Sequence, residues 1–396
     1  MADANLPTLL FYCQHSLGIG HLTRSFALAG ALRERFRVVF LNGGRLPQGV
    51  AVPSGVRCIH LPPLGMDDGH AVVSRDGDFD LATARAERTR LIQQAVAHTR
   101  PALLLVELFP FGRKKFADEI LPMIRAARRQ GARVACSLRD ILVDGRRDQQ
   151  HHDDRACWLV NRYFDAVLVH SDPAFARLED SFRPRRPLRT PILYSGFVVP
   201  ERRLDVQQAR GEHVIVSAGG GIVGEDLFRA ALAAHRRTGM PMQLVAGPFL
   251  PEPQWQALRH EAAGLQGVTL LRHVPDLAAA MCTARASISQ CGYNTALDLV
   301  VSQVPALVVP YATATENEQQ QRAARLASLG ALQWLEPHLL DGAALAAALP
   351  GLLRFRPRPA ALGLDGARRS ADLLAQLAGT AAQPQRVAAE LACATC

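Results

Sequence analysis

The chain has 396 residues, of which 48% are apolar and 20% are charged. This length allows two compact domains, and the composition is too apolar for a disordered chain. The formal net charge is +9, and arginine carries it, because Lys114 and Lys115 are the only lysines. This charge permits an anionic partner such as a nucleotide or an acidic membrane face, but it does not select one.

The eight cysteines form no regular framework, and the terminal pair Cys393 and Cys396 has no further ligands nearby. We interpret them as reduced thiols of a cytosolic protein. The sequence contains no uninterrupted run of about eighteen apolar residues and does not begin with the basic and apolar regions of a signal peptide. We therefore expect a cytoplasmic protein that touches the inner membrane face peripherally at most.

Short apolar runs alternate with helical stretches in the first half. The first run, Leu9 to Cys13, leads into a loop containing Gly18 and Gly20, and a helical pattern extends from Leu22 to Arg35. Further runs span Arg37 to Leu41, Ala102 to Val106, Arg133 to Ser137 and Ala166 to His170. This alternation predicts a parallel sheet covered by helices on both faces.

The segment from Ser181 to Gly211 is rich in arginine and proline, so we place the domain boundary there and divide the chain into residues 1–195 and 196–396. Beyond it, apolar runs resume at His213 to Ser217, Met242 to Ala246, Val268 to His273, Ala286 to Ser289 and Ala306 to Val309. The prediction is an α/β protein with two Rossmann-like, doubly wound parallel sheets. The last helix, Ala367 to Leu377, is free to pack back on the first domain.

Ligands of such sheets bind beyond the carboxyl ends of the strands, and two candidate catalytic residues lie there. His21 follows Gly18 and Gly20, whose flexible backbone allows a tight turn and a close approach to a ligand. A neutral imidazole at that position can take a proton from a hydroxyl group, but a histidine that only caps or packs a helix start is equally compatible with the spacing. Glu107 ends the run LLLVE and either orients this imidazole, caps the next helix or pairs with Arg113.

A second glycine loop, Gly219, Gly220 and Gly221, follows the first strand of the second half. Consecutive glycines expose backbone N–H groups that suit a diphosphate, although a plain tight turn is the alternative. The spacing matches neither GxGxxG nor GxxxxGK[ST], which disfavours a dinucleotide-binding fingerprint and a P-loop.

The richest block of polar residues extends from Ser287 to Gly330. Gly292, Tyr293, Asn294 and Thr295 open a helix whose free N–H groups and dipole favour phosphate. Asp298 lies one turn further, within reach of a ribose diol, and Glu318 with Gln319 opens a later helix where their side chains can bind sugar hydroxyls. Each of these residues can also serve as a helix cap.

Other patterns in the sequence give weaker indications of function. The acidic loop from Asp76 to Asp80 has the spacing of a calcium site, but Leu81 stands where the sharp turn needs glycine, so we predict no metal site. Scattered arginines and 6% aromatic residues argue against nucleic-acid binding. An apolar and basic segment can touch an anionic membrane, or be a solvated helix start; its residues are Phe109, Phe111, Lys114, Lys115 and Phe116.

The stretch from His213 to about Gly330 resembles the donor-binding domain of GT-B glycosyltransferases, in particular the MurG-type N-acetylglucosaminyltransferases and the UDP-glycosyltransferases. The loop Gly18 to His21 is similar to their glycine-rich acceptor-side loop. The resemblance implies a GT-B fold, in which an acceptor-binding domain and a nucleotide-sugar domain face each other across a cleft. It also implies that no cofactor is needed beyond the nucleotide-diphosphate sugar as co-substrate.

The resemblance also assigns roles to residues. It makes His21 the base and Glu107 its orienting partner, and it makes Asp298 the carboxylate that binds ribose. The donor-binding set that we assign is Gly18, Gly20, Gly219, Gly220, Gly221, Val274, Gly292, Tyr293, Asn294, Thr295, Asp298, Glu318 and Gln319, with the backbone of Val274 at the base. The chain departs from the family where Cys291 replaces a glycine and where Glu107 stands for an aspartate.

We therefore expect an inverting, metal-independent transfer of a hexosyl group from a nucleotide-diphosphate sugar, with UDP as the nucleotide, to an unidentified acceptor hydroxyl. Two other functions fit the same fold, since a scaffold does not determine a reaction. One is a nucleotide-sugar epimerase, and the other is a non-catalytic regulator that binds a nucleotide sugar.

Overall fold

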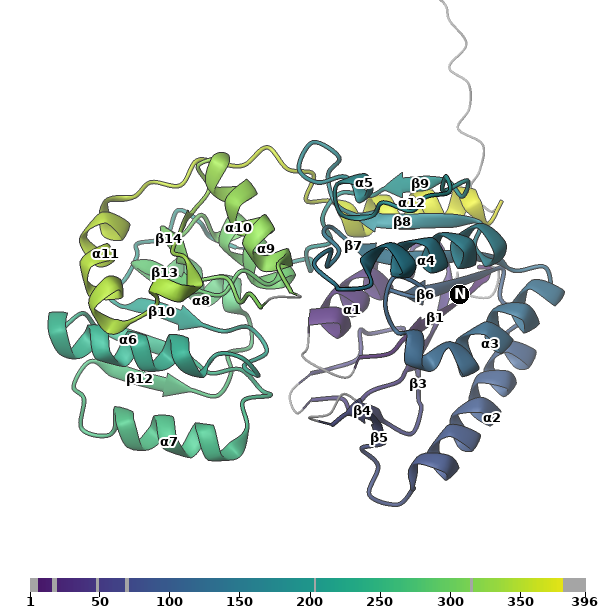
Figure 1. The fold of residues 1–396 in the computed structure, drawn as a ribbon, viewed down its shortest axis with the longest axis horizontal. Coiled ribbons are helices and arrows are strands. Elements are labelled where there is room, and N and C mark those ends of the chain that lie inside the picture. The colour runs from purple at the N-terminus through teal and green to yellow at the C-terminus, as the bar shows by residue number, and fades with distance from the viewer. Residues whose placement is uncertain are drawn as a thin grey trace, which may run out of the picture.

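The computed structural model describes residues 6–15, 20–47, 50–67, 71–202, 204–313 and 316–379, so Gly18 lies outside the described residues. Two parallel sheets stand side by side, and helices cover both faces of each (Figure 1). This arrangement confirms the predicted α/β class with two doubly wound sheets.

The first sheet has seven parallel strands in the order β3-β2-β1-β6-β7-β8-β9. They are β1 (Thr8–Cys13), β2 (Arg37–Asn42), β3 (Arg57–His60), β6 (Leu103–Glu107), β7 (Arg133–Arg139), β8 (Ala166–His170) and β9 (Ile192–Tyr194). The helices are α1 (Gly20–Leu32), α2 (Leu81–Thr99), α3 (Ala117–Arg129), α4 (Gln149–Tyr163) and α5 (Leu178–Ser181), with the 3-10 turn η2 (Lys114–Phe116). A small antiparallel pair, β4 (Leu64–Met66) and β5 (Val72–Ser74), lies beside them.

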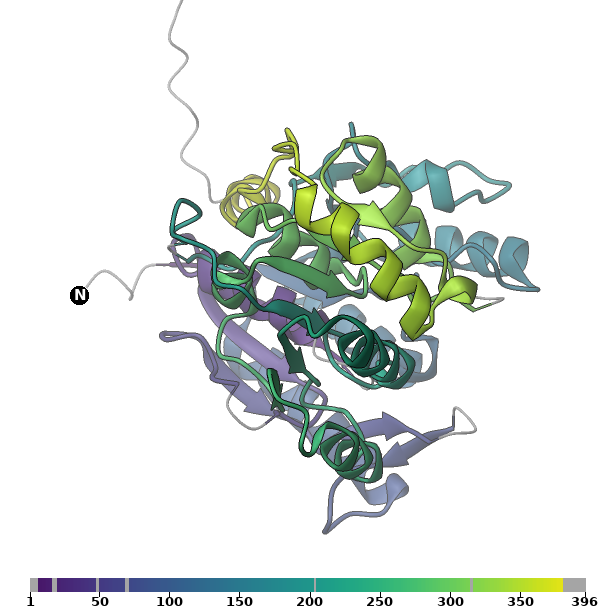
Figure 2. The same ribbon diagram turned by 90° about the vertical axis from the view of Figure 1, so that its left-hand side faces the viewer.

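The second sheet has six parallel strands in the order β12-β11-β10-β13-β14-β15. They are β10 (Val214–Ser217), β11 (Met242–Val245), β12 (Val268–Leu271), β13 (Ala286–Ser289), β14 (Ala306–Val308) and β15 (Gln333–Trp334). The helices are α6 (Glu225–Thr238), α7 (Glu252–Ala262), α8 (Leu277–Thr283), α9 (Tyr293–Ser302), α10 (Glu318–Ser328), α11 (Gly342–Arg354) and α12 (Gly366–Leu377), with the 3-10 turn η3 (Pro337–Leu339). Viewed from the side of this domain, α6 and α11 lie in front of its strands and pack against each other (Figure 2).

Each sheet separates two apolar cores because successive side chains of a strand point to opposite faces. In β1, Leu10 and Tyr12 belong to one core, whereas Leu9, Phe11 and Cys13 belong to the other, and all five are fully buried. Burial on both faces explains why these strands are continuous apolar runs in the sequence.

The chain crosses back at its end. Helix α12 follows the second sheet in sequence, yet its Ala371, Leu374 and Ala375 pack in the core that contains Leu22 and Phe26 of α1. Figure 1 shows α12 beside β8 and β9 of the first sheet. The last strand of the first sheet ends at Tyr194 and the first strand of the second begins at Val214, while the division at residues 195 and 196 stays a prediction.

Both sheets reverse their strand order at one point, between β1 and β6 in the first and between β10 and β13 in the second. At such a point the loops of two neighbouring strands diverge and leave room for a ligand. All the strands concerned are parallel, so the site is expected where these four strands end.

Strands β3 and β9 are among the elements that the sequence prediction missed. Strand β9 lies in the segment whose arginine and proline content suggested a linker, and its three residues are only half-buried at the sheet edge. Strand β3 is also an edge strand, and its side chains are half-buried or exposed. Edge strands lack the continuous apolar signal of central strands because one side faces solvent or a loop. Among the described residues, none of the helices is long and apolar enough to cross a membrane.

Candidate active site

The structure brings His21 and Glu107 together at the reversal point of the first sheet. His21 is the second residue of α1, and Glu107 is the last residue of β6, the strand beside β1. The His21 Nδ1 atom lies 2.7 Å from Glu107 Oε1. An ionised carboxylate only accepts hydrogen bonds, so this contact places the ring proton on Nδ1 and leaves Nε2 free to receive a proton.

Arg24 is a third member of this group that the sequence prediction missed. Its Nη2 atom donates to the same Glu107 oxygen at 2.6 Å, and both side chains are buried. Arg24 stands three residues after His21 on α1, and this spacing puts two side chains on one helix face. That spacing was the available signal. The second carboxylate oxygen, Oε2, is buried without a partner among the described residues.

Burial and charge set the protonation of this pair. Burial lowers the pKa of His21 from 6.5 to about 4, although Glu107 opposes the change, and Arg113 and Arg24 add to it. Burial alone would raise the pKa of Glu107, but His21, Arg24 and Arg113 together hold that pKa well below 4.5. At neutral pH the pair is therefore a neutral imidazole next to an ionised carboxylate.

The first turn of α9, at the reversal point of the second sheet, contacts the start of α1, where His21 lies. Asn294 Nδ2 donates to the backbone oxygen of Gly20 at 3.1 Å, so the residue before His21 touches the first turn of α9. The N-cap of α9 is Gly292, and a side chain added there would meet nothing within 4 Å. The first turn of a helix has backbone N–H groups without helical partners, so this open approach suits an anion.

The glycine loop after β10 lies beside the same helix start. Gly219 has a φ of +59°, and a Cβ there would stand 3.2 Å from Thr295 Oγ1. Gly221, with a φ of +94°, packs instead against backbone, where a Cβ would be 2.4 Å from the oxygen of Ala246. The loop therefore brings Gly219 to α9, while Gly221 makes close packing possible. Gly220 lies between them and accepts from Phe249 N at 2.9 Å.

Tyr293 serves the contact between the two halves of the molecule. Its ring is buried, and its hydroxyl donates to His170 O at 3.2 Å and accepts from Val198 N at 3.0 Å. The Arg24 guanidinium lies 5.1 Å from the ring centroid. The Tyr293 side chain is thus held by His170 of the first domain and by Val198 of the segment between the sheets, and its backbone remains part of the helix start.

Asp298 is largely buried and is held by the segment between the sheets. Arg202 Nη2 donates to Asp298 Oδ1 at 2.9 Å, and Arg202 Nη1 donates to Asp276 Oδ1 at 2.6 Å. Burial raises the pKa of Asp298 from 3.8 to about 7, while Arg202 lowers it and Asp276 raises it. Arg202 was not predicted, because it lies in a segment with no periodic pattern.

Glu318 and Gln319 point to different partners. Glu318 forms an ion pair with Arg139, which ends β7 of the first domain. Gln319 Oε1 accepts from the N–H groups of Cys291 and Tyr311 at 2.9 and 3.1 Å, which ties α10 to the loop before α9. Arg139 also was not predicted, since its partner is on another domain.

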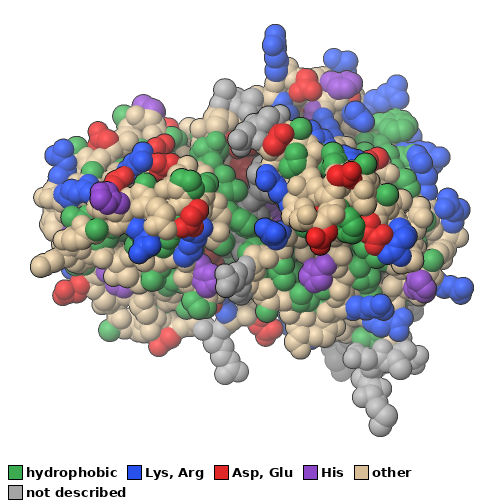
Figure 3. Space-filling model, turned by 90° about the horizontal axis from the view of Figure 1, so that it is seen from below, with side chains coloured by type: hydrophobic (Ala, Val, Ile, Leu, Met, Phe, Trp, Pro, Cys, Tyr) green, Lys and Arg blue, Asp and Glu red, His purple; other side chains and the backbone are tan. Residues whose placement is uncertain are grey.

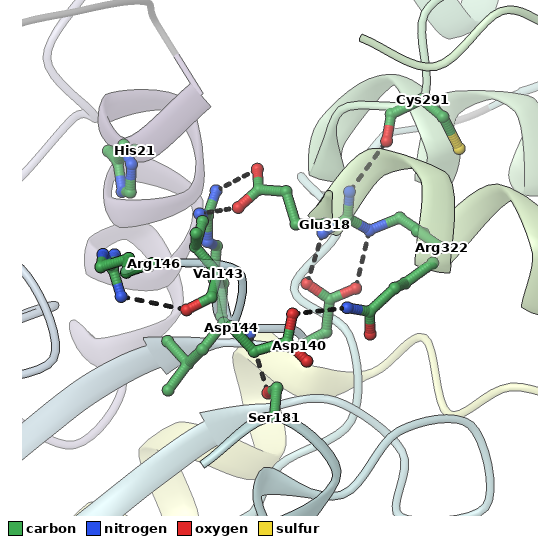
Figure 4. Close-up of polar contacts among 12 residues, drawn as sticks. His21, Asp140, Val143, Asp144, Arg146, Ser181, Cys291, Glu318 and Arg322 are labelled. Atoms are coloured by element: carbon green, nitrogen blue, oxygen red, sulfur yellow. Dashed lines mark hydrogen bonds and ion pairs between the residues drawn. The ribbon is translucent and has the colours of Figure 1, made fainter. Parts of the chain in front are cut away.

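A polar contact between α10 and the loop after β7 closes the two halves on each other. Arg322 donates from Nε to Asp140 Oδ2 at 2.7 Å and from Nη2 to Asp140 Oδ1 at 2.8 Å, and both side chains are buried (Figure 4). Asp144 accepts from Asn317 and Gln321 at 2.7 and 3.1 Å. In the close-up, His21 lies on the opposite side of Glu318 from Arg322.

Val274 lies two residues before the N-cap of α8 and is half-buried. Its backbone N–H and C=O have no hydrogen-bond partner within the ranges that the structure describes. A free donor and acceptor on one residue match the edge of a nucleobase.

The membrane candidates at residues 109–116 require a correction. Phe109, Phe111 and Phe116 are 1%, 2% and 1% exposed and belong to the first core, so they form no apolar surface patch.

The space-filling view shows a recess between the two lobes, with basic and acidic side chains interspersed on both (Figure 3). Within the described part of the chain, no three histidine, cysteine or acidic side chains are grouped as metal ligands.

Sequence relatives point to one family. The model of the glycosyltransferase family 28 C-terminal domain matches residues 251–376. A UDP-N-acetylglucosamine--N-acetylmuramyl-(pentapeptide) pyrophosphoryl-undecaprenol N-acetylglucosamine transferase of Cupriavidus metallidurans is 29% identical over 58% of this chain and 65% of its own length. The enzyme of the same name from Halorhodospira halophila is 26% identical over 87% of this chain and 89% of its own length. The chain thus spans slightly less than two thirds of the Cupriavidus relative.

Solved structures agree on the fold. MurG of Acinetobacter baumannii superposes with a TM-score of 0.58 at 17% identity, covering 93% of this chain and all of that one. A UDP-glucosyltransferase from Polygonum tinctorium gives a TM-score of 0.61 at 16% identity, covering 95% and 99%. Both likenesses span the two domains and the segment between them. The chain is therefore a MurG-like protein of the GT-B fold, with a glycosyltransferase family 28 C-terminal domain in its second half.

Proposed function

We propose that this protein is a glycosyltransferase that moves a hexosyl group from a UDP-sugar to an acceptor hydroxyl, with inversion and without a metal ion. The observation that carries the proposal is the contact between the two sheets' reversal points. It sets the His21 and Glu107 pair, which can accept a proton, against the open helix start of α9, which can hold a diphosphate. The names of the sequence relatives support UDP as the nucleotide of the donor.

In the proposed reaction, His21 acts as general base. Its Nε2 atom takes the proton of the acceptor hydroxyl as that oxygen attacks the anomeric carbon, and the bond to the diphosphate oxygen breaks. Glu107 keeps the Nδ1 proton in place and stabilises the imidazolium, and Arg24 keeps Glu107 ionised. Attack from the side opposite to the leaving diphosphate inverts the anomeric centre.

The second domain holds the donor in this proposal. The N–H groups at the start of α9 and the Gly219 loop stabilise the charge that develops on the departing diphosphate. Asp298 accepts from the ribose hydroxyls, and the free backbone of Val274 pairs with the base. Glu318 and Gln319 lie on the same helix start, where the sugar would be bound, and Glu318 would exchange Arg139 for a sugar hydroxyl or share it.

The first experiment identifies the donor and the base. UDP-, dTDP- and GDP-sugars are screened by thermal shift, since a ligand that binds the folded state raises the melting temperature. UDP release is then measured with the best donor and an extract that supplies acceptors. We expect His21→Ala to lower turnover by about two to four orders of magnitude while UDP binding is retained. His98→Ala, at an exposed histidine near the end of α2, is the matched control.

Three results would contradict the proposal. Full turnover in His21→Ala would remove His21 from the mechanism. Formation of an epimeric sugar from the donor alone would indicate an epimerase. Tight donor binding without turnover on any acceptor extract would indicate a regulator. Peripheral contact with an anionic membrane and a cytoplasmic location stay predictions alongside this function.

A further inference from the structure

One charged side chain reaches from the connecting segment into the donor half of the site. Arg202 belongs to the chain between β9 and β10, whose described residues form no helix or strand. Its two terminal nitrogens bond different carboxylates, Asp276 at 2.6 Å and Asp298 at 2.9 Å. Asp276 also caps α8 by accepting from Ala279 N at 3.1 Å. Arg202 therefore joins the starts of two helices that border the proposed nucleoside site.

The contact is buried but incomplete. The side chains of Arg202 and Asp298 are 15% and 11% exposed, and the Nε atom of Arg202 has no partner in the described residues. Within the same residues, Arg202 is the one side chain that bonds Asp298, and it uses Oδ1 alone. Among the described residues, no side chain or backbone group bonds the second oxygen, Oδ2.

We propose that Arg202 is a positioning residue for donor binding, which fixes the Asp298 carboxylate through Oδ1 and leaves Oδ2 for a ribose hydroxyl. This inference rests on the proposed function, because it takes Asp298 as the ribose-binding group. It adds that the segment joining the domains helps to form the nucleoside site. A fragment that begins at β10 (Val214–Ser217) would therefore lack a part of the donor site.

The charges around Asp298 support this role. Burial raises the pKa of Asp298 to about 7, with Asp276 of α8 acting in the same direction and Arg202 of the connecting segment acting against both. Helices α1 and α10 also contact α9, but their nearby charged groups, Arg24 and Arg322, lie over the Tyr293 ring. Without Arg202, Asp298 would be protonated to a higher pH, and a neutral carboxyl makes weaker hydrogen bonds than a carboxylate.

A role in which Arg202 blocks Asp298 predicts a different change in UDP affinity. If Arg202 merely blocks Asp298 in the free protein, UDP has to displace it, and removing the guanidinium should tighten UDP binding. If Arg202 holds the Asp298 carboxylate in place and ionised, removing it should weaken UDP binding, and the part of the loss that comes from protonation of Asp298 should be recovered at higher pH. The two roles therefore differ in the sign of the affinity change.

The test is calorimetric titration of the full chain with UDP at several pH values between 6 and 9. We expect Arg202→Met to weaken UDP binding by about fivefold at pH 7, since a rise of about one unit in the pKa of Asp298 lowers its ionised fraction from about one half to about one tenth. The affinity should return toward that of the wild type by pH 9. Arg202→Lys retains the charge and should restore most of the affinity at pH 7. Asp276→Asn removes the neighbouring negative charge, still caps α8, and should move the pH profile in the acid direction.

Asp298→Ala separates this inference from the proposed function. If UDP binding survives Asp298→Ala, the assignment of the nucleoside site is wrong. If Asp298→Ala abolishes binding but Arg202→Met binds UDP more tightly, or with an unchanged pH profile, the positioning role alone is overturned. Should Arg202→Met not fold, Arg202→Lys and Asp276→Asn decide the point, because the role requires Arg202→Lys to retain most of the UDP affinity at pH 7 and Asp276→Asn to move the pH profile in the acid direction.

Discussion

At the scale of single residues, the site depends on which groups are charged. His21 is surrounded by a carboxylate and by arginines, and burial decides the outcome in favour of the neutral ring. A general base is active only when it is unprotonated, so a lowered pKa extends its active form to lower pH. The protein thus keeps a neutral imidazole next to an ionised carboxylate, although the negative charge of Glu107 by itself favours protonation of the ring.

We predict that turnover at saturating donor and acceptor is constant from pH 8 to pH 6 and falls only as the pH approaches about 4. Saturation with donor removes the effect of Asp298 on affinity, so the remaining pH dependence reports the base. The measurement is the rate of UDP release against pH. An inflection near pH 6.5, the ordinary pKa of histidine, would contradict the prediction. Glu107→Gln should lower the plateau, because the amide no longer favours the imidazolium.

At the scale of elements, the start of α9 is the place where sequence pattern and geometry agree most closely. Gly292 has an ordinary φ of −62°, and a methyl group added there would meet no protein atom within 4 Å. The glycine is therefore not required by the backbone or by packing. A ligand that passes close to the helix start would explain it.

We predict that Gly292→Ala weakens UDP binding while the free energy of unfolding changes by less than about 1 kcal/mol, the usual range for replacing a glycine cap. The added methyl group blocks the approach to the N–H groups without touching the protein. Gly77→Ala, where a Cβ also meets nothing, is the control and should leave binding unchanged. Titration with UDP and urea unfolding measure the two effects. Unchanged UDP affinity in Gly292→Ala would place the diphosphate elsewhere.

At the scale of the whole molecule, the two domains are held by contacts of different kinds. The Arg322 and Asp140 pair is 2% and 0% exposed and joins α10 to the loop after β7. The Arg35 and Asp372 pair, which joins the turn after α1 to α12, is 50% and 46% exposed. Removing one partner of a buried ion pair leaves the other charge unpaired and away from water, whereas the remaining charge of an exposed pair is hydrated.

We predict that Asp140→Asn destabilises the closed arrangement by about 3–5 kcal/mol and that Asp372→Asn changes it by at most about 1 kcal/mol. Small-angle scattering should show a larger radius of gyration for Asp140→Asn, because the two domains separate more often. The double variant Asp140→Leu with Arg322→Met removes both charges and should restore much of the closed state. Equal scattering curves for Asp140→Asn and the wild type would show that this pair does not hold the domains together.

The sequence by itself determined the layered architecture and the edge at which the site lies. Runs such as Ala166 to His170 and Ala286 to Ser289 are strands with these same bounds, because a central parallel strand is buried on both faces and carries its signal locally. The positions of His21, Glu107 and Gly292 at strand ends followed from the same runs.

Only the tertiary structure decided which of these residues meet. Arg202 and Asp298 are 96 residues apart in the chain, and Arg139 and Glu318 are 179 apart, so no local period connects them. Their pairing depends on how the connecting segment and the domain contact are placed. Hydrophobic periodicity reports the environment of each residue separately, whereas an ion pair between distant segments depends on the packing of the whole chain.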